Sequence, residues 1–253
     1  MTYKEKAKWK AISSEKLDIE FIAKNKEYLD FKLVCKNSLI TIYDINKYKL
    51  KDYIDWTNFV LYQTVEPEFI WNNCRKVDWT KVSAAPELNA FMMDNYGGYL
   101  NWSIVTGKHK FSEEILLQFK DKIDWKQACI SQKLSMEFID NNFNMFKPYL
   151  YEVCKYQKLT ERFMRNHKNE LDWNTISEYQ KLSEKFILEM SDYVNWVWIS
   201  EKQKLSKEFI LQNKDKLIMT RIFCRKKISL PKEIKNSEYF KIYKIYSKAL
   251  EVG

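Results

Sequence analysis

Hydrophobic residues recur along this chain with a period of 23 residues, and tryptophan marks the period. Trp79 follows Trp56 by 23 residues, Trp102 follows Trp79 by the same interval, and Trp125 follows Trp102 likewise. Where Phe, Leu or Met replaces Trp the pattern continues, which gives ten positions that we call slots. The slots are Trp9, Phe31, Trp56, Trp79, Trp102, Trp125, Leu150, Trp173, Trp196 and Met219. A fixed period of this length indicates a repeat architecture.

Each slot is expected to begin a short helix. The third residue after every slot is apolar, as in Val82 and Ile176, and the fourth is mostly Ser, Thr or Cys. This i, i+3, i+4 spacing defines one buried helix face. An Asp or Asn precedes most of the Trp slots, as Asp172 precedes Trp173, and its side chain is placed to cap the first turn. The pattern predicts a first helix of about seven residues in each repeat.

A second helix is expected later in each repeat. Gln recurs seven residues after the slot, and a Leu and then a Ser or Thr follow it, as Ser183 follows Gln180. The hydroxyl and the Glu behind it, such as Glu184, are typical of a capped and negatively charged first turn. Apolar pairs such as Phe186-Ile187 then supply the buried face, which predicts a helix of about ten residues. Pro67 fits a first helical position, where its missing donor is not needed.

Helices this short are marginal in water by themselves, so neighbouring repeats must bury one another's apolar faces. The sequence therefore predicts an all-α fold, an α-solenoid of about nine to ten stacked short helix pairs. We expect a single elongated repeat domain over residues 1–253, most regular over about 54–217, with a basic C-terminal cap over 218–253. Near residues 36–53 the spacing lengthens and the run Leu39 to Tyr43 is expected to be irregular or strand-like.

Composition excludes several other classes of protein. The chain has only four Gly and four Pro, which argues against a turn-rich β-sandwich and against the glycine-rich phosphate loops of nucleotide-binding folds. No apolar run is long enough for a signal peptide or a membrane span. We expect a cytoplasmic protein without membrane contact.

Catalytic and metal-binding chemistry is not indicated. The five Cys lie far apart and there are only two His, so neither a zinc site nor a disulfide framework is expected. His109 and His167 are interpreted as structural, and Cys35, Cys129 and Cys154 as small packing residues, because they occupy repeat positions that other residues fill elsewhere. No residues converge as a catalytic mechanism requires. We expect no enzyme, no cofactor, no metal and no small-molecule substrate.

One face of the first helices carries the candidate partner-binding residues. Positions two and six after the slot lie opposite the buried face and are mostly polar. Against that background the aromatic and basic exceptions are expected to form a ridge in the C-terminal half; they are Tyr156, Tyr179, Trp198, Lys202, Arg221 and Arg225. Such residue types are enriched at binding hot spots. Incidental exposure, or contact with a neighbouring helix, is the alternative interpretation.

Positive charge is concentrated at the C-terminal end. Residues 202–253 carry fourteen Lys or Arg and five Asp or Glu, while the whole chain has a net charge of +9. The candidate nucleic-acid-binding residues are Arg221, Arg225, Lys226, Lys227, Lys232 and Lys235. Basic clusters attract nucleic acids and acidic protein surfaces alike, and many are only solvated faces.

The repeat from Leu171 to Ile187 resembles the short DW-x-x-IS-x-x-Q-x-LS-x-x-FI helical repeats encoded by phages and large DNA viruses. The resemblance is clear from about Trp56 to Leu217. It implies a non-enzymatic interaction protein, in its sharpest form a phage or mobile-element inhibitor. Such an inhibitor, of the anti-CRISPR type, would dock on a large protein or ribonucleoprotein of host defence, such as an RNA-guided CRISPR nuclease in the bacterial cytoplasm. The alternative is a sequence-tolerant RNA- or DNA-binding repeat protein.

Overall fold

The computed structural model describes residues 2–225, 230–238 and 240–244. Over these residues it contains 21 α-helices, α1 to α21, two short 3-10 helices and no strand, and residues 240–244 are helical as well. The chain divides into two compact units, Met1–Asp124 and Trp125–Gly253. None of the described helices is long and apolar enough to cross a membrane. The prediction of an all-α stacked helical repeat is confirmed, whereas the single elongated domain over residues 1–253 stays a prediction.

Every repeat consists of a first helix, here called helix A, and a second, called helix B. In the first unit helix A is α1 (Tyr3–Ser13), α3 (Phe31–Asn37), α5 (Trp56–Tyr62), α7 (Trp79–Ala84) and α9 (Trp102–Lys108). In the second unit it is α11 (Trp125–Ser131), α14 (Leu150–Tyr156), α16 (Trp173–Tyr179), α18 (Trp196–Lys202) and α20 (Met219–Phe223). Nine of these ten helices begin at the predicted slot; α1 begins six residues before Trp9.

Helix B follows after a short extended loop. In the first unit it is α2 (Ile19–Asn25), α4 (Ile42–Lys47), α6 (Pro67–Trp71), α8 (Ala90–Tyr96) and α10 (Glu113–Gln118). In the second unit it is α12 (Met136–Asn141), α15 (Glu161–Asn166), α17 (Glu184–Glu189), α19 (Lys207–Gln212) and α21 (Lys232–Asn236). The additional elements are η1 (Cys74–Lys76), α13 (Phe143–Phe146) and η2 (Lys147–Tyr149).

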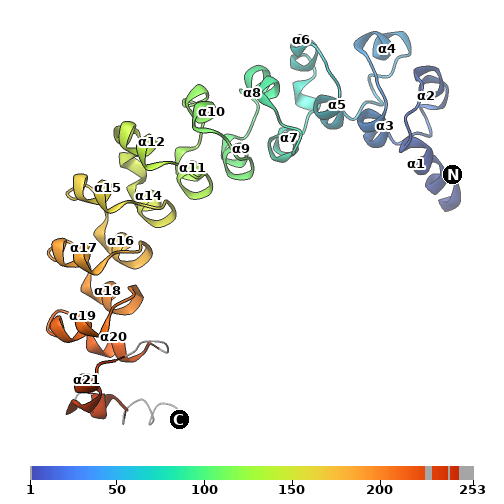
Figure 1. The fold of residues 1–253 in the computed structure, drawn as a ribbon. Helices are drawn as coiled ribbons and strands as arrows, with labels where there is room; N and C mark the ends of the chain where they lie inside the picture. The colour runs from blue at the N-terminus through green and yellow to red at the C-terminus, as the bar shows by residue number, and fades with distance from the viewer. Residues whose placement is uncertain (1, 226–229, 239, 245–253) are drawn as a thin grey trace. The chain divides into compact units, whose positions relative to one another are not determined.

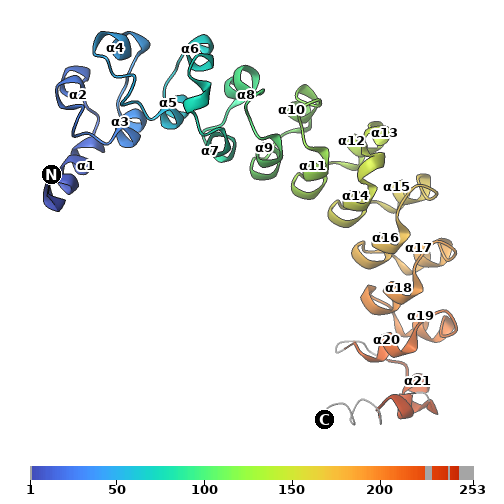
Figure 2. The ribbon, with the colours of Figure 1, turned by 180° about the vertical axis from the view of Figure 1, so that it is seen from behind.

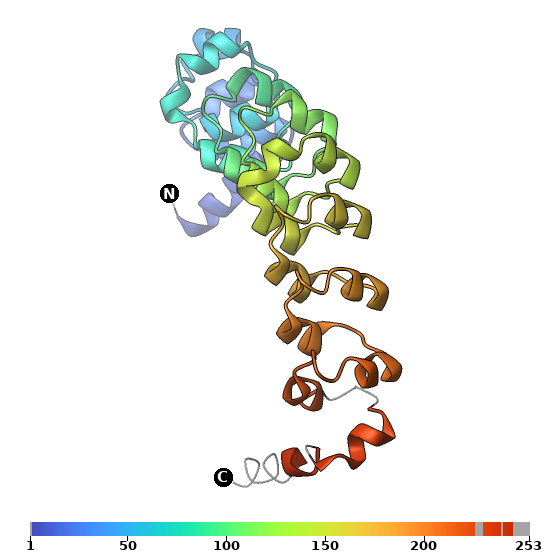
Figure 3. The ribbon, with the colours of Figure 1, turned by 90° about the vertical axis from the view of Figure 1, so that its left-hand side faces the viewer.

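Successive helices A pack directly on one another inside each unit, as α3 does on α5 and α16 on α18. In the first unit α3, α5, α7 and α9 lie along one edge, and helices B lie along the other (Figures 1 and 2). In the second unit α14, α16 and α18 are separated from α15, α17 and α19 in the same way (Figure 1). The side-on view of Figure 3 shows the repeats of residues 150–217 following one after another.

Side-chain caps are present at the helix starts where the sequence predicted them. Asp172 accepts hydrogen bonds from the amides of Asn174 and Thr175 at the start of α16. Ser183 accepts one from the amide of Phe186 at the start of α17. Such caps satisfy amides that the helix itself leaves unpaired, each contributing about 1 kcal/mol. Pro67 stands at the first position of α6, as predicted.

The core lies between stacked helices A and under helix B. The apolar residue three after the slot is completely buried in nine of ten repeats, and Ile12 at the end of the stack is half-buried. In helix B, Phe186 is 1% exposed and Ile187 fully buried. Burial of each such side chain stabilises the fold by about 1.5–3 kcal/mol. Because the repeats supply these contacts to one another, a helix of seven residues is stable here although it would not be alone.

Two sequence predictions about the elements were wrong in detail. Helix B has five to seven residues, not about ten, because the chain turns before it reaches the buried Leu or Val that ends the repeat. Residues 36–53 were expected to be irregular, but they contain α4. Thr41 and Asp44 cap this helix reciprocally, each side chain bonding the other residue's backbone amide, and a capping box starts a helix even within a β-branched run.

Candidate interaction surface

Buried glutamines join consecutive repeats. The Nε2 of Gln180 donates to the backbone carbonyls of Cys154 (2.6 Å) and Gln157 (2.8 Å), and its Oε1 accepts from the amide of Leu159 (3.0 Å). Gln203 makes the same three bonds one repeat later, and Gln157 makes them one repeat earlier. The sequence showed that this Gln recurs but did not show why. Its role is to satisfy three backbone groups of the preceding repeat, which helices of seven residues leave exposed.

Hydroxyl groups form a second connection between repeats. Ser177 donates to the carbonyl of Trp173 at 2.7 Å and accepts from the amide of Asn195, the cap of the next helix A, at 2.9 Å. Ser83 does the same with Trp79 and Asn101. Where a Ser follows the buried apolar position, its hydroxyl therefore links the repeat to the next, in addition to fitting the tight packing.

Tryptophan slots are less uniformly buried than predicted. Trp56, Trp125 and Trp173 are buried, whereas Trp9, Trp79, Trp102 and Trp196 are half-buried. In four repeats the indole Nε1 donates to the carbonyl five residues earlier, as Trp173 does to Lys168 at 2.7 Å. The indole thus satisfies a carbonyl in the turn after helix B, and it is a structural group.

Two of the predicted partner-binding residues are exposed on helix A of the second unit. Tyr156 ends α14 and Tyr179 ends α16, and their side chains are 47% and 45% exposed. The Lys155 ammonium lies 5.3 Å from the Tyr156 ring centroid and 4.9 Å from that of Tyr179, and it donates to the Tyr151 hydroxyl at 3.3 Å. The hydrogen bond to Tyr151 and the surrounding phenol groups raise the pKa of Lys155 well above its usual range. The structure therefore places an ammonium between two exposed rings from adjacent repeats.

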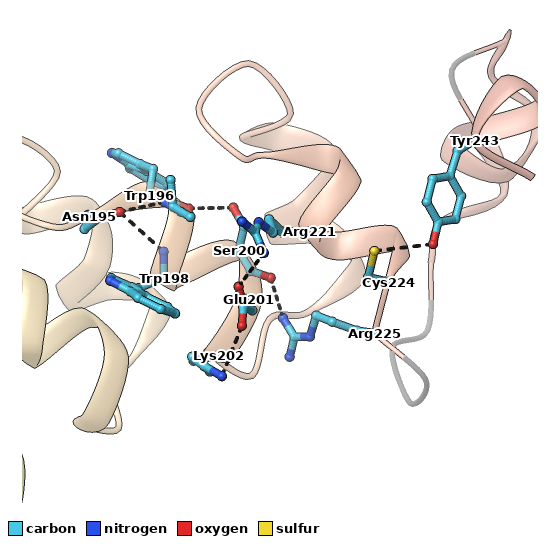
Figure 4. Close-up of polar contacts among 11 residues, drawn as sticks. Asn195, Trp196, Trp198, Ser200, Glu201, Lys202, Arg221, Cys224, Arg225 and Tyr243 are labelled. Atoms are coloured by element: carbon cyan, nitrogen blue, oxygen red, sulfur yellow. Dashed lines mark hydrogen bonds and ion pairs between the residues drawn. The ribbon is translucent and has the colours of Figure 1, made fainter. Parts of the chain in front are cut away.

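A second group of predicted residues meets around one carboxylate. Glu201 lies 3.1 Å from the Lys202 ammonium and 3.2 Å from the Arg221 guanidinium (Figure 4). Lys202 also lies 5.7 Å from the Trp198 ring centroid. Trp198 is half-buried, while Lys202 and Arg221 are exposed. Exposed ion pairs of this kind contribute little to stability, at most about 1 kcal/mol, so these charges stay accessible to a partner.

Arg225 is engaged inside the fold. Its Nη1 donates to the carbonyl of Ser200 at 3.1 Å and its Nη2 to that of Gln203 at 2.7 Å; Figure 4 draws the bond to Ser200. These carbonyls correspond to those that Gln203 bonds in the repeat before it, Ser177 and Gln180. Arg225 thus takes the structural place of the recurring Gln, and its partial burial lowers the pKa of the guanidinium. A binding role for it stays a prediction.

The remaining predicted nucleic-acid-binding residues lie near the C-terminus. Lys232 and Lys235 are exposed on α21. Lys226 and Lys227 lie outside the described residues. The predicted basic cap falls partly on residues 226–229, 239 and 245–253, which are outside the described residues as well.

Both histidines contact other parts of the fold, and Cys35, Cys129 and Cys154 are buried. His109 Nε2 lies 2.9 Å from the carbonyl of Ser83, in the place that Gln holds elsewhere. His167 stacks on Phe143 and lies 2.6 Å from the Asp140 carboxylate. Burial raises the pKa of the Cys35 and Cys154 thiols to about 12, which opposes formation of a reactive thiolate. Among the described residues no cluster of His, Cys, Asp and Glu is arranged to hold a metal ion.

An exposed apolar surface in the first unit was missed by the sequence analysis. Tyr43 on α4 is 68% exposed and Phe91 on α8 is 50% exposed. They line one groove together with Val65 and Pro67. Both lie at the starts of helices B, where the sequence pattern indicated only caps.

Comparison with known proteins found no match: no family model, no curated protein and no solved structure matches this chain. The fold therefore defines the chain only as a stacked helical repeat protein.

Proposed function

We propose that this chain is a non-enzymatic macromolecule-binding repeat protein whose partner-binding surface is the helix A edge of Trp125–Gly253. The observation that carries the proposal is the pair Tyr156 and Tyr179. These rings come from adjacent repeats, are nearly half exposed, and lie on either side of the Lys155 ammonium. Exposed aromatic rings beside cations are the residues that anchor protein interfaces. The nearby Lys202 and Arg221 extend the same kind of surface into the next repeats.

The sharper form of the proposal is a phage or mobile-element inhibitor that docks on a host defence complex. The support is the resemblance of the repeat to those of phages and large DNA viruses, together with exposed rings beside cations, residue types that are enriched at interfaces. An RNA-guided CRISPR nuclease, whose guide RNA is a polyanion, is the partner that we propose in this form. Inhibition would be steric or conformational, because the repeat disperses polar groups along the described residues, whereas catalysis needs groups that converge.

A paired set of variants tests the surface. Tyr156→Gln with Tyr179→Gln removes both exposed rings, while Leu188→Gln with Leu211→Gln removes two exposed apolar side chains of helix B. After nuclease treatment, affinity capture from a bacterial lysate is compared by quantitative mass spectrometry. Proteins captured by wild type and by the leucine variant, but lost with the tyrosine variant, support the surface. Equal capture by both variants rejects it.

The defence-inhibitor form has its own test. Expression of the chain in bacteria that carry an active RNA-guided nuclease should restore plating of a targeted phage, and the tyrosine variant should not. If wild type restores no plating against any of the nuclease types assayed, the inhibitor form is rejected while the binding surface is still tested by capture.

Nucleic-acid binding at the basic C-terminal end is the second candidate function. It is favoured by the exposure of Lys232 and Lys235, neither of which forms an ion pair among the described residues. If it is correct, changing both to Gln should weaken binding to a long single strand and reduce the salt dependence. Unchanged binding would reject it.

A further inference from the structure

A row of lysines follows the buried glutamines of the second unit. Each Gln that joins repeats is followed directly by Lys and then Leu, in the order Gln, Lys, Leu. The lysine row consists of Lys133, Lys158, Lys181 and Lys204, and all four are exposed. The glutamines before them are 5–8% exposed and the leucines after them 5–9% exposed. The exposure thus alternates with every residue of the loop.

The backbone conformation explains this alternation. Gln157, Gln180 and Gln203 have φ and ψ values near those of a β-strand, for example −89° and 149° at Gln180. In extended backbone, successive side chains point to opposite faces. Because Gln and Leu are directed into the fold, the lysine between them is directed toward solvent.

The glutamine bonds also hold neighbouring loops in register. Gln203 bonds the carbonyl of Gln180, Gln180 bonds that of Gln157, and Gln157 bonds that of Gln132, all at 2.7–2.9 Å. Each bonded carbonyl directly precedes the amide of a lysine in the row. The lysines are therefore fixed at equivalent positions of adjacent repeats. Since the helices A before them pack directly, the lysines recur once per stacked helix, and the axes of packed helices lie about 8–10 Å apart.

Exposed aromatic rings flank the row. Lys158 and Lys181 line one open groove with Lys155, Tyr156 and Tyr179, and no carboxylate lines it. Two half-buried carboxylates of neighbouring helices B are engaged in the fold instead. Glu161 accepts from the amide of Ser183, and Glu184 accepts from the amide and hydroxyl of Ser206.

The fold itself does not require the lysines. In the first unit Gln63 forms the same set of hydrogen bonds, which we call the glutamine ladder. It donates to the carbonyls of Cys35 and Ser38 and accepts from the amide of Ile40. The outward residue between Ser38 and Ile40 is Leu39, which is 69% exposed, and Thr64 follows Gln63. A ladder of the same geometry thus carries uncharged residues there, so the regular positive charge belongs to the surface of the second unit.

We propose that the lysine row, together with Tyr156 and Tyr179, is a binding site for single-stranded nucleic acid, with phosphates held by the lysines and bases stacked on the rings. A polyanion with charge at regular intervals complements cations placed once per repeat, and every base offers a face that stacks on an aromatic ring. An acidic protein surface offers neither regular charge nor planar faces in series. The site shares Tyr156 and Tyr179 with the partner-binding surface proposed above, but it is separate from the C-terminal residues and does not depend on a defence complex as partner.

The test measures fluorescence anisotropy of labelled oligo(dT) and oligo(U), each about 20 nucleotides long, between about 50 and 200 mM salt. The site variant carries Lys158→Gln, Lys181→Gln and Lys204→Gln. The control carries Lys185→Gln, Lys207→Gln and Lys214→Gln, which removes the same charge from exposed lysines elsewhere in the second unit. The site variant should bind at least tenfold more weakly at low salt, and its slope of log K against log salt should fall by about 2. The control should stay within about threefold of wild type.

The rings are tested separately. Tyr156→Leu with Tyr179→Leu should reduce affinity by about fivefold or more per ring while leaving the salt slope unchanged. The proposal is overturned by equal weakening in the site and control variants, by no binding of wild type to either oligonucleotide at low salt, or by equally effective competition from polyglutamate. Capture of a protein partner is measured after nuclease treatment, so it does not depend on nucleic acid. Failure of the oligonucleotide test therefore leaves the protein-binding proposal standing, and failure of the capture test leaves the nucleic-acid proposal standing.

Discussion

The side-chain amide of Gln203 donates a hydrogen bond of 2.7 Å to the backbone carbonyl of Gln180, and Gln180 bonds the carbonyl of Gln157 in the same way. One residue type thus connects three consecutive repeats. The connection satisfies backbone groups at the ends of short helices, where an unpaired buried group costs about 1–3 kcal/mol. Gln180 and Ser177 are the residues at which such connections between repeats can be tested.

Replacing Gln180 by Met should lower the free energy of unfolding by about 3 kcal/mol or more. Met fills a similar volume but leaves the carbonyls of Cys154 and Gln157 and the amide of Leu159 without their partner. The measurement is urea unfolding followed by circular dichroism. The exposed neighbour Lys181→Met is the control and should change stability by no more than about 0.5 kcal/mol. Equal losses of unfolding free energy in the two variants would contradict a structural role of the glutamine hydrogen bonds.

Ser177→Ala should cost about 1–2 kcal/mol, because the amide of Asn195 loses its acceptor in a part-buried position. Ser177→Cys should cost less, since Cys35, Cys129 and Cys154 occupy this repeat position naturally and are buried there. Thermal melting of the two variants side by side checks the order. A cysteine variant less stable than the alanine variant would show that the position selects for volume and not for an acceptor.

Stability should decline in alkaline solution because of the buried thiols. The pKa of Cys35 and of Cys154 is about 12 in the fold, against 9.0 ordinarily. Each neutral thiol therefore makes its full contribution to the free energy of unfolding below pH 9. This contribution is lost as the pH rises from 9 toward 12, by about 1.4 kcal/mol per pH unit. Urea midpoints at about pH 8 and pH 10 should converge in the variant with Cys35→Ser and Cys154→Ser. The same decline in wild type and variant would assign it to other groups.

Substitutions at Arg225 and Arg221 should have different effects, the first on stability and the second on binding. Arg225→Ala removes two hydrogen bonds to backbone carbonyls and should lower stability by about 2 kcal/mol, with partial recovery in Arg225→Lys, which restores one donor group. Arg221→Ala breaks an exposed ion pair with Glu201 and should leave stability within about 1 kcal/mol. Any effect of Arg221→Ala on partner capture then reports on binding alone. A large stability loss in that variant would place Arg221 in the fold as well.

Much of the architecture could be predicted from the sequence because each repeat is built from local rules. The slot residues predicted where nine helices begin, and the caps before them, such as Asp172, act through amides two or three residues away. Helix B was predicted too long because its end depends on where the chain must turn to bring Leu171 or Val194 under the next repeat, and that is a packing requirement. The helix at Ile42–Lys47 was missed although its signal, Thr41 and Asp44, was visible.

The candidate site was harder to predict. Tyr156 and Tyr179 were identified as residues that break a polar pattern, and they are exposed. Trp198 and Arg225 broke the same pattern but are partly buried, because the exposure of these positions depends on what the neighbouring repeat supplies. The lysine row was not identified, although Lys directly follows the recurring Gln in all four repeats; its exposure and register follow from the bonds of the glutamines beside it.

By itself the sequence determined the repeat length, the helix starts and the buried face of each helix, because these follow from contacts within a few residues and from a fixed period. The tertiary structure decided which polar side chains face inward. Gln180 and Lys181 are neighbours of similar polarity, yet one is buried and the other exposed. The difference arises because the preceding repeat presents unpaired backbone groups on one side of an extended loop and solvent on the other.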